Sequence, residues 1–395
     1  MKRILLILLL FIIVLPVNAK ENWSFIYING ANNNNTRMRN WYVNGVKKLH
    51  PYLKKYFEKN QYIQNYFEKY GGLEIQETPV IFFWGYKSSR DLNYVKKQIK
   101  LTKRWSAPGS YFAKLFLTEN FHDAIWIQKP NNMQSVIEEL NKTVKNEAKN
   151  GNDIVLYGYS AGAFVGYEYI FNKIRFINFE ELLTKINADE EIINFVKSHP
   201  KKNTCLSALS GKYADIGALD YTNQFVLNED KNKFKNNWLK IDEITELACA
   251  PEKNVKGIVY FANAMPLFYS DLFDETFDLN IYNSLLIKYI LENGMFMLTV
   301  NFREDPLGFS LSRNFTTKEI EKHLKMEINN PTGVIYNNSD VWAFRIFIIA
   351  HQCYWSAAKT FAKAVVKSLV EGYKFQYNIQ YQKKVKAEHK KKSGL

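Results

Sequence analysis

The sequence predicts an α/β fold with a mostly parallel central sheet that is flanked by helices on both faces. Several short apolar runs are rich in β-branched and aromatic residues, which is typical of buried strands. Stretches with helical periodicity separate these runs, and such alternation favours an α/β sheet. The predicted strands are 23–28, 80–84, 124–127, 154–157, 257–261 and 295–300.

Two stretches between these strands carry further information: one has helical spacing, and the other is a long insertion. Apolar residues recur at helical spacing from Met133 to Val144, and Asn150-Gly151 is a typical helix stop. The alternation then breaks from about 176 to 252, a stretch rich in charge and Asn with no convincing central strand. We expect this segment to be a helical cap insertion that lies over the carboxyl ends of the strands.

Length and composition favour one large domain. The chain has 395 residues, of which 47% are hydrophobic and 15% aromatic, so it can bury a large core. We expect a domain over 20–382 that contains the insertion, followed by a basic C-terminal tail over 383–395.

The first nineteen residues have the pattern of a signal peptide. Lys2 and Arg3 precede an apolar run over 4–14, and the small-residue pattern Val17-Asn18-Ala19 follows. The run is shorter than the roughly 18 to 20 residues that span a bilayer, which favours cleavage after Ala19 over an uncleaved anchor. The expected location is therefore periplasmic or extracellular.

The formal charge of +14 does not by itself indicate a nucleic-acid partner. Lys and Arg are scattered apart from the tail, and no DNA- or RNA-binding motif is present. We therefore expect a solvated basic surface and no nucleic acid, and attraction to an anionic membrane or cell surface stays an open alternative.

Cysteine usage predicts neither a metal site nor a cofactor. Outside the cytoplasm Cys205 and Cys249 could pair, since both lie in the insertion, but the sequence does not establish this. Their spacing and the lack of a nearby His argue against zinc.

A nucleophile elbow is predicted at Gly158-Tyr159-Ser160-Ala161-Gly162. A Gly-x-Ser-x-Gly match is weak alone, but this one follows a predicted strand and opens a helical pattern. The sharp turn needs glycines on both sides of Ser160 because a Cβ there would clash. Ser160 is therefore the expected nucleophile, against the alternative of a structural serine in a Gly-rich turn.

The general base is expected at His351. A serine hydroxyl needs a base that removes its proton, and in this arrangement the order along the chain is Ser, acid, His. His199 lies in the insertion, and His323 lies in a charged helical run that favours a solvated side chain. His351 ends an apolar run and precedes a helix, so it is placed at the edge of the sheet, although a buried structural His is the alternative.

The orienting acid is expected just after the strand over 295–300. Asp305 is favoured because Pro306 and Gly308 mark a turn that would hold it there. Glu304 is the nearest competitor, and Asp340 is a weaker one.

Backbone N–H groups must also stabilise the oxyanion of an acyl-transfer reaction. One is expected from Ala161, directly after Ser160. The second is expected from the turn after the first strand, where Gly30 permits tight geometry and Ala31 offers an N–H.

These residues resemble the α/β-hydrolase superfamily, in particular its bacterial lipase- and esterase-like members. The elbow at Ser160, Asn29-Gly30, the Asp305-Pro306-Leu307 segment and His351-x-x-Tyr354-Trp355 carry the resemblance. It implies an α/β-hydrolase fold and the roles of acid for Asp305 and base for His351.

The resulting hypothesis is an exported serine hydrolase that cleaves carboxylic esters, lipid esters included, through an acyl-enzyme. One alternative is an envelope acyltransferase that uses the same triad. The other is a catalytically silent binding protein that keeps the fold.

Overall fold

The computed structural model describes residues 20–31, 36–68, 71–101, 108–171, 254–267, 290–310, 331–343 and 347–392, with Glu190, Ile287, Ile320, Glu321 and Ile328. Three sequence predictions lie outside these residues: the signal peptide over 1–19, the insertion over 176–252 except Glu190, and the pairing of Cys205 with Cys249.

The centre of the molecule is a seven-stranded sheet in which all strand pairs are parallel. The strand order is β2-β1-β4-β5-β6-β7. β2 pairs with the first residues of β1, and β3 pairs with the last residues of β1 on the same side. Because the strands are parallel, their carboxyl ends lie along one edge of the sheet. The strands are β1 (Glu21–Ile28), β2 (Leu73–Ile75), β3 (Val80–Phe82), β4 (Asp153–Tyr159), β5 (Val255–Phe261), β6 (Phe296–Phe302) and β7 (Val334–Val341).

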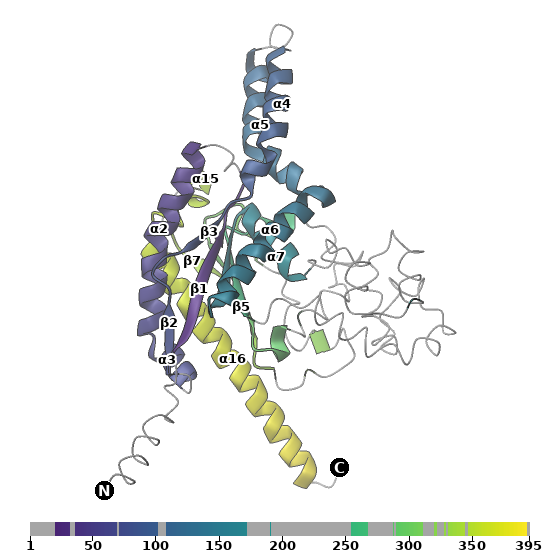
Figure 1. The fold of residues 1–395 in the computed structure, drawn as a ribbon. Helices are drawn as coiled ribbons and strands as arrows, with labels where there is room; N and C mark the ends of the chain where they lie inside the picture. Colours follow the sequence, from purple (N-terminus) through teal and green to yellow (C-terminus); the bar gives the residue numbers. More distant parts are fainter. Residues whose placement is uncertain are drawn as a thin grey trace.

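Helices cover both faces of this sheet (Figure 1). One face packs against α2 (Thr36–Lys59), α3 (Gln61–Phe67) and α16 (Ala358–Lys392), and the other against α6 (Pro130–Lys149) and α7 (Ala161–Phe171). Alternation along β1 shows how the sequence separates the two cores. Trp23, Phe25 and Tyr27 point to the α2 and α16 side, whereas Ile26 and Ile28 point to the α6 and α7 side. The predicted α/β architecture, with a parallel sheet between helices, is thus confirmed.

A helical hairpin leaves the carboxyl edge after β3. The short helix η2 (Gly85–Ser88) leads into α4 (Ser89–Leu101), and α5 (Pro108–Ile127) returns to the sheet. Figure 1 shows α4 and α5 side by side, projecting from the body of the molecule. Two further short helices among the described residues are η6 (Met265–Leu267) and α15 (Phe347–Ala350). Within the described part of the chain, none of the helices has both the length and the apolar character required to cross a bilayer.

The strand predicted over 124–127 is wrong, because these residues form the last turn of α5. A run of four apolar residues does not separate a strand from a buried helix segment, since neither period is visible over so short a length. Here Ala124, Trp126 and Ile127 are buried, while Ile125 is 65% exposed.

Two strands were not predicted, and the basic tail has helical backbone. β2 has only three residues, and β7 lies at the end of the strand order, where Asn337 to Asp340 give it a polar sequence. The expected tail over 383–395 continues α16 as far as Lys392.

Helix α7 approaches β1 so closely that position 162 has no room for a side chain. A Cβ there would lie 2.3 Å from the Ile28 carbonyl oxygen and 2.6 Å from that of Asn29. We expect Gly162→Ala to lower the free energy of unfolding by about 1–3 kcal/mol, because the helix must move off the strand. Urea unfolding followed by circular dichroism measures this change. Gly109→Ala is the control, since no atom lies within 4 Å of the added Cβ; equal stability of the two variants would contradict the prediction.

Candidate active site

Ser160 occupies the sharp turn between β4 and α7. Its φ of 53° lies in the left-handed region, which non-glycine residues rarely adopt and which costs about 1–3 kcal/mol. Neighbouring backbone holds it there: its N–H donates to the Phe261 carbonyl at 3.0 Å, and its carbonyl accepts from the Ala163 N–H at 2.9 Å. The side chain of this strained residue is only half-buried, at the carboxyl edge of the sheet.

His351 lies in the turn after α15, and its ring faces Ser160. The imidazole Nε2 is 3.0 Å from the Ser160 Oγ, which is hydrogen-bonding distance. The backbone of His351 is tied to the elbow as well, since the Tyr159 hydroxyl donates to its carbonyl at 2.9 Å. Tyr159, next to Ser160 in the chain, therefore positions the segment that carries the imidazole.

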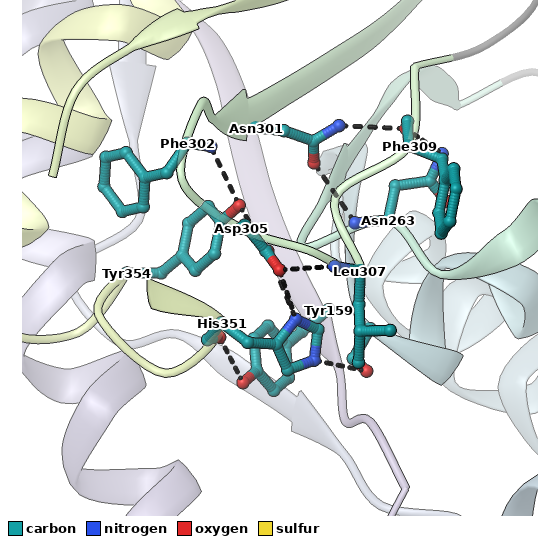
Figure 2. Close-up of polar contacts among 10 residues, drawn as sticks. Tyr159, Asn263, Asn301, Phe302, Asp305, Leu307, Phe309, His351 and Tyr354 are labelled. Atoms are coloured by element: carbon teal, nitrogen blue, oxygen red, sulfur yellow. Dashed lines mark hydrogen bonds and ion pairs between the residues drawn. The ribbon is translucent and has the colours of Figure 1, made fainter. Parts of the chain in front are cut away.

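Asp305 binds the other ring nitrogen of His351 (Figure 2). Its Oδ1 and Oδ2 lie 2.9 Å and 3.1 Å from Nδ1, and its side chain is fully buried while that of His351 is 17% exposed. Two further donors reach the carboxylate. The Leu307 N–H donates to Oδ1 at 2.9 Å, and the Tyr354 hydroxyl donates to Oδ2 at 2.9 Å. Buried carboxylates need such partners, because an unpaired charge in the interior is costly.

Tyr354 connects the acid to the end of β6. Its hydroxyl accepts from the Phe302 N–H at 3.0 Å while donating to Asp305. Burial, and secondly the charge of Asp305, raises the pKa of Tyr354 well above its ordinary value, and burial likewise raises the pKa of Tyr159. Both phenols therefore stay protonated, and each remains a hydrogen-bond donor to its acceptor in the site.

The structure separates the three acids that the sequence left as competitors. Asp305 makes the contact with His351, whereas the Glu304 carboxylate accepts from the Ala343 N–H at 3.0 Å. Asp340 is exposed on β7, and its N–H donates to the Asn338 side chain. His199 and His323, the alternative bases, lie outside the described residues.

Gly30 lies directly against the elbow. A Cβ at this position would come within 2.9 Å of the Ser160 Cβ and 3.1 Å of the Tyr159 carbonyl oxygen. Only glycine allows the two backbones to approach this closely. Ala31 follows, half-buried against the core on the α6 and α7 side, and Ala161 is the first residue of α7, where the N–H has no acceptor within the helix.

Asn29 holds this turn in place. Its Oδ1 accepts from the Trp84 N–H at 2.8 Å, and its own carbonyl accepts from the Trp84 indole N–H at 2.6 Å. Its Nδ2 donates to the Gly30 carbonyl at 2.7 Å. The buried amide thus joins the ends of β1 and β3 beside Ser160.

A second amide pair holds the ends of β5 and β6. The Asn301 Oδ1 accepts from the Asn263 N–H at 3.1 Å, and both side-chain amides donate to the Phe309 carbonyl. Figure 2 shows this pair beside the Asp305 loop. Asn263 is fully buried, and its hydrogen bond to the Phe309 carbonyl holds the loop that contains Asp305.

Sequence reasoning proposed Ser160, Asp305 and His351, and the structure brings their side chains together in one chain of hydrogen bonds. The sequence did not reveal the positioning contacts of Tyr159, Leu307 and Tyr354. Tyr354 did occur in the His-x-x-Tyr segment, but that spacing alone does not show that its hydroxyl reaches a carboxylate. Across the described ranges, no group of three or more His, Cys, Asp or Glu side chains is arranged to hold a metal ion.

Comparison of the chain with protein-family models, curated proteins and solved structures gives no match. A functional assignment therefore depends on the geometry of the site itself.

Replacement of Tyr354 by Phe tests its role as a positioning residue. We expect Tyr354→Phe to lower the free energy of unfolding by about 1–3 kcal/mol, because the buried Phe302 N–H and one oxygen of Asp305 each lose a partner. Urea unfolding measures the loss. The matched control is Tyr86→Phe, whose exposed hydroxyl binds Glu139 and can be replaced by water. Unchanged stability in Tyr354→Phe would refute the proposed role.

Proposed function

We propose that this protein is a serine hydrolase of the α/β-hydrolase type that cleaves carboxylic esters. The observation that carries the proposal is the 3.0 Å contact between the Oγ of Ser160 and the Nε2 of His351, made at a strained strand-to-helix turn. The other nitrogen of the same imidazole binds a fully buried carboxylate. A hydroxyl, an imidazole and a carboxylate in this order are the groups that nucleophilic acyl transfer requires.

The proposed reaction begins with attack of the Ser160 Oγ on the ester carbonyl carbon. His351 Nε2 takes the hydroxyl proton, and Asp305 stabilises the imidazolium through the Nδ1 proton. The oxyanion lies against the Ala161 N–H and the N–H groups of the Gly30-Ala31 turn. Nε2 then gives the proton to the departing alkoxide, so that an alcohol leaves and an acyl-enzyme remains.

Hydrolysis completes the proposed cycle. His351 removes a proton from water, the hydroxide attacks the acyl carbon, and Ser160 leaves with the proton that Nε2 returns. The product is a free carboxylic acid. Export after cleavage at Ala19 is part of the same proposal, and it places the reaction in the periplasm or outside the cell.

A fluorophosphonate probe tests the nucleophile directly. We expect it to label the wild-type protein on Ser160, because the probe reacts with an activated serine hydroxyl, and not to label Ser160→Ala. With nitrophenyl esters, Ser160→Ala should lower kcat by on the order of 10⁶. Mass spectrometry of the adduct and the rate of nitrophenol release are the two measurements. A wild-type protein that neither labels nor releases nitrophenol would support the silent binding protein instead.

Paired carboxylate variants test the acid. Asp305→Asn should lower kcat by on the order of 10⁴, because the amide cannot stabilise the imidazolium and favours the wrong tautomer. Glu304→Gln should leave kcat close to the wild-type value, since the Glu304 carboxylate accepts from the Ala343 N–H, and glutamine keeps an acceptor oxygen for that bond. Steady-state kinetics on one soluble ester compare the two. The assignment fails should Glu304→Gln prove the more damaging change.

A further inference from the structure

The hairpin formed by α4 and α5 projects from the body of the described fold (Figure 1). It leaves the carboxyl edge directly after β3 and η2, which is the edge that carries Ser160, Asp305 and His351. Helix α4 has 13 residues and is therefore about 20 Å long. The far end of the hairpin thus stands well clear of the sheet that anchors its base.

Contacts of α5 with η2 and α4 hold the hairpin together along its length. At the base, the Ser88 hydroxyl donates to the buried Asp123, and the Trp126 indole donates to Asp91 at 2.9 Å. Toward the tip, the Lys96 ammonium and the Glu119 carboxylate are 2.9 Å apart. These contacts fix α4 and α5 relative to one another.

The tip exposes large apolar side chains. Leu101, the last residue of α4, is 71% exposed, and Phe112, in the first turns of α5, is 67% exposed. Helix α5 as a whole is apolar without a strongly polar face, which is unusual for a helix that projects from a fold. Large apolar side chains that are exposed near the end of a projecting element are candidates for an interaction surface.

Basic side chains surround the same tip. Lys97, Lys100 and Lys114 are exposed there, and the acidic residue of this part of the hairpin, Glu119, is paired with Lys96. An apolar tip with a basic border has the chemistry that binds an anionic lipid surface, where apolar groups enter the interface and Lys or Arg contact the headgroups.

We propose that the α4–α5 hairpin docks this protein on an anionic phospholipid surface through Leu101 and Phe112, with the surrounding lysines contacting the headgroups. Docking at this tip would turn the edge of the sheet that holds Ser160 toward the lipid. The proposal does not require that Ser160 be a nucleophile, so the two can be tested separately.

Vesicle co-sedimentation with the exported form of the protein tests the proposal. The probes are vesicles of phosphatidylcholine alone and vesicles of equal parts phosphatidylcholine and phosphatidylglycerol. We expect the wild type to sediment with the anionic vesicles, and binding to weaken as salt is added, because ions screen the lysines. The double variant Leu101→Ser, Phe112→Ser should bind at least about tenfold more weakly, since two apolar side chains no longer enter the interface. Lys97→Gln with Lys100→Gln should lose the preference for anionic vesicles.

The control is a matched pair of exposed apolar residues elsewhere. Phe375 and Tyr377 on α16 are 53% and 66% exposed, and their replacement by Ser should leave vesicle binding unchanged. Fluorophosphonate labelling equal to that of the wild type shows that each variant keeps its site, and Ser160→Ala should bind vesicles normally. A wild-type protein that binds the anionic vesicles but is not labelled would count against the proposed function alone.

Three results would overturn the docking proposal. The first is a wild-type protein that stays in solution with both vesicle types, and the second is a tip variant that binds as the wild type does. The third is a wild-type dimer in sedimentation velocity without lipid that becomes a monomer in the tip variant, which would assign the tip to a second copy of this chain.

Discussion

Parallel pairing of every strand in the sheet is the constraint on which the candidate site depends. Because each strand ends at the same edge, the residues that follow β1, β3, β4 and β6 meet there although they are far apart in the chain. Ser160 follows β4, Asp305 follows β6, and the Asn29-Gly30 turn follows β1. His351 arrives differently, in the turn between α15 and α16, and the Tyr159 hydroxyl holds its backbone at the elbow.

The buried carboxylate of Asp305 accounts for the cluster of hydrogen-bond donors at the carboxyl ends of the strands. Its two oxygens receive hydrogen bonds from His351, Leu307 and Tyr354, so three protein groups compensate the buried charge. The Tyr354 hydroxyl also satisfies the last backbone N–H of β6. The Tyr354 hydroxyl therefore holds the Asp305 carboxylate at the end of β6, and Asp305 in turn holds the His351 imidazole.

The hairpin and the candidate site share the carboxyl edge, but different physical requirements shape them. At the site, polar groups are buried and paired, which gives a defined geometry. Near the end of the hairpin, Leu101 and Phe112 are exposed. Apolar surface in contact with water is unfavourable in free energy, and burial against another apolar surface would remove that cost. The hairpin also contains the one predicted strand that is wrong, since residues 124–127 form the last turn of α5.

Local sequence patterns determined the α/β architecture and the identity of the candidate groups. The apolar runs at β1, β4, β5 and β6 are long enough to show strand composition, and the glycines around Ser160 identify a sharp turn wherever it folds. Only the tertiary structure decided which partner each group has. Asp305 and Glu304 are adjacent and chemically alike, yet only the curvature of the loop after β6 directs one toward His351 and the other toward the Ala343 backbone. The contacts of Tyr159 and Tyr354 were equally invisible, because a hydrogen bond between residues 49 or 192 positions apart depends on packing that no local pattern records.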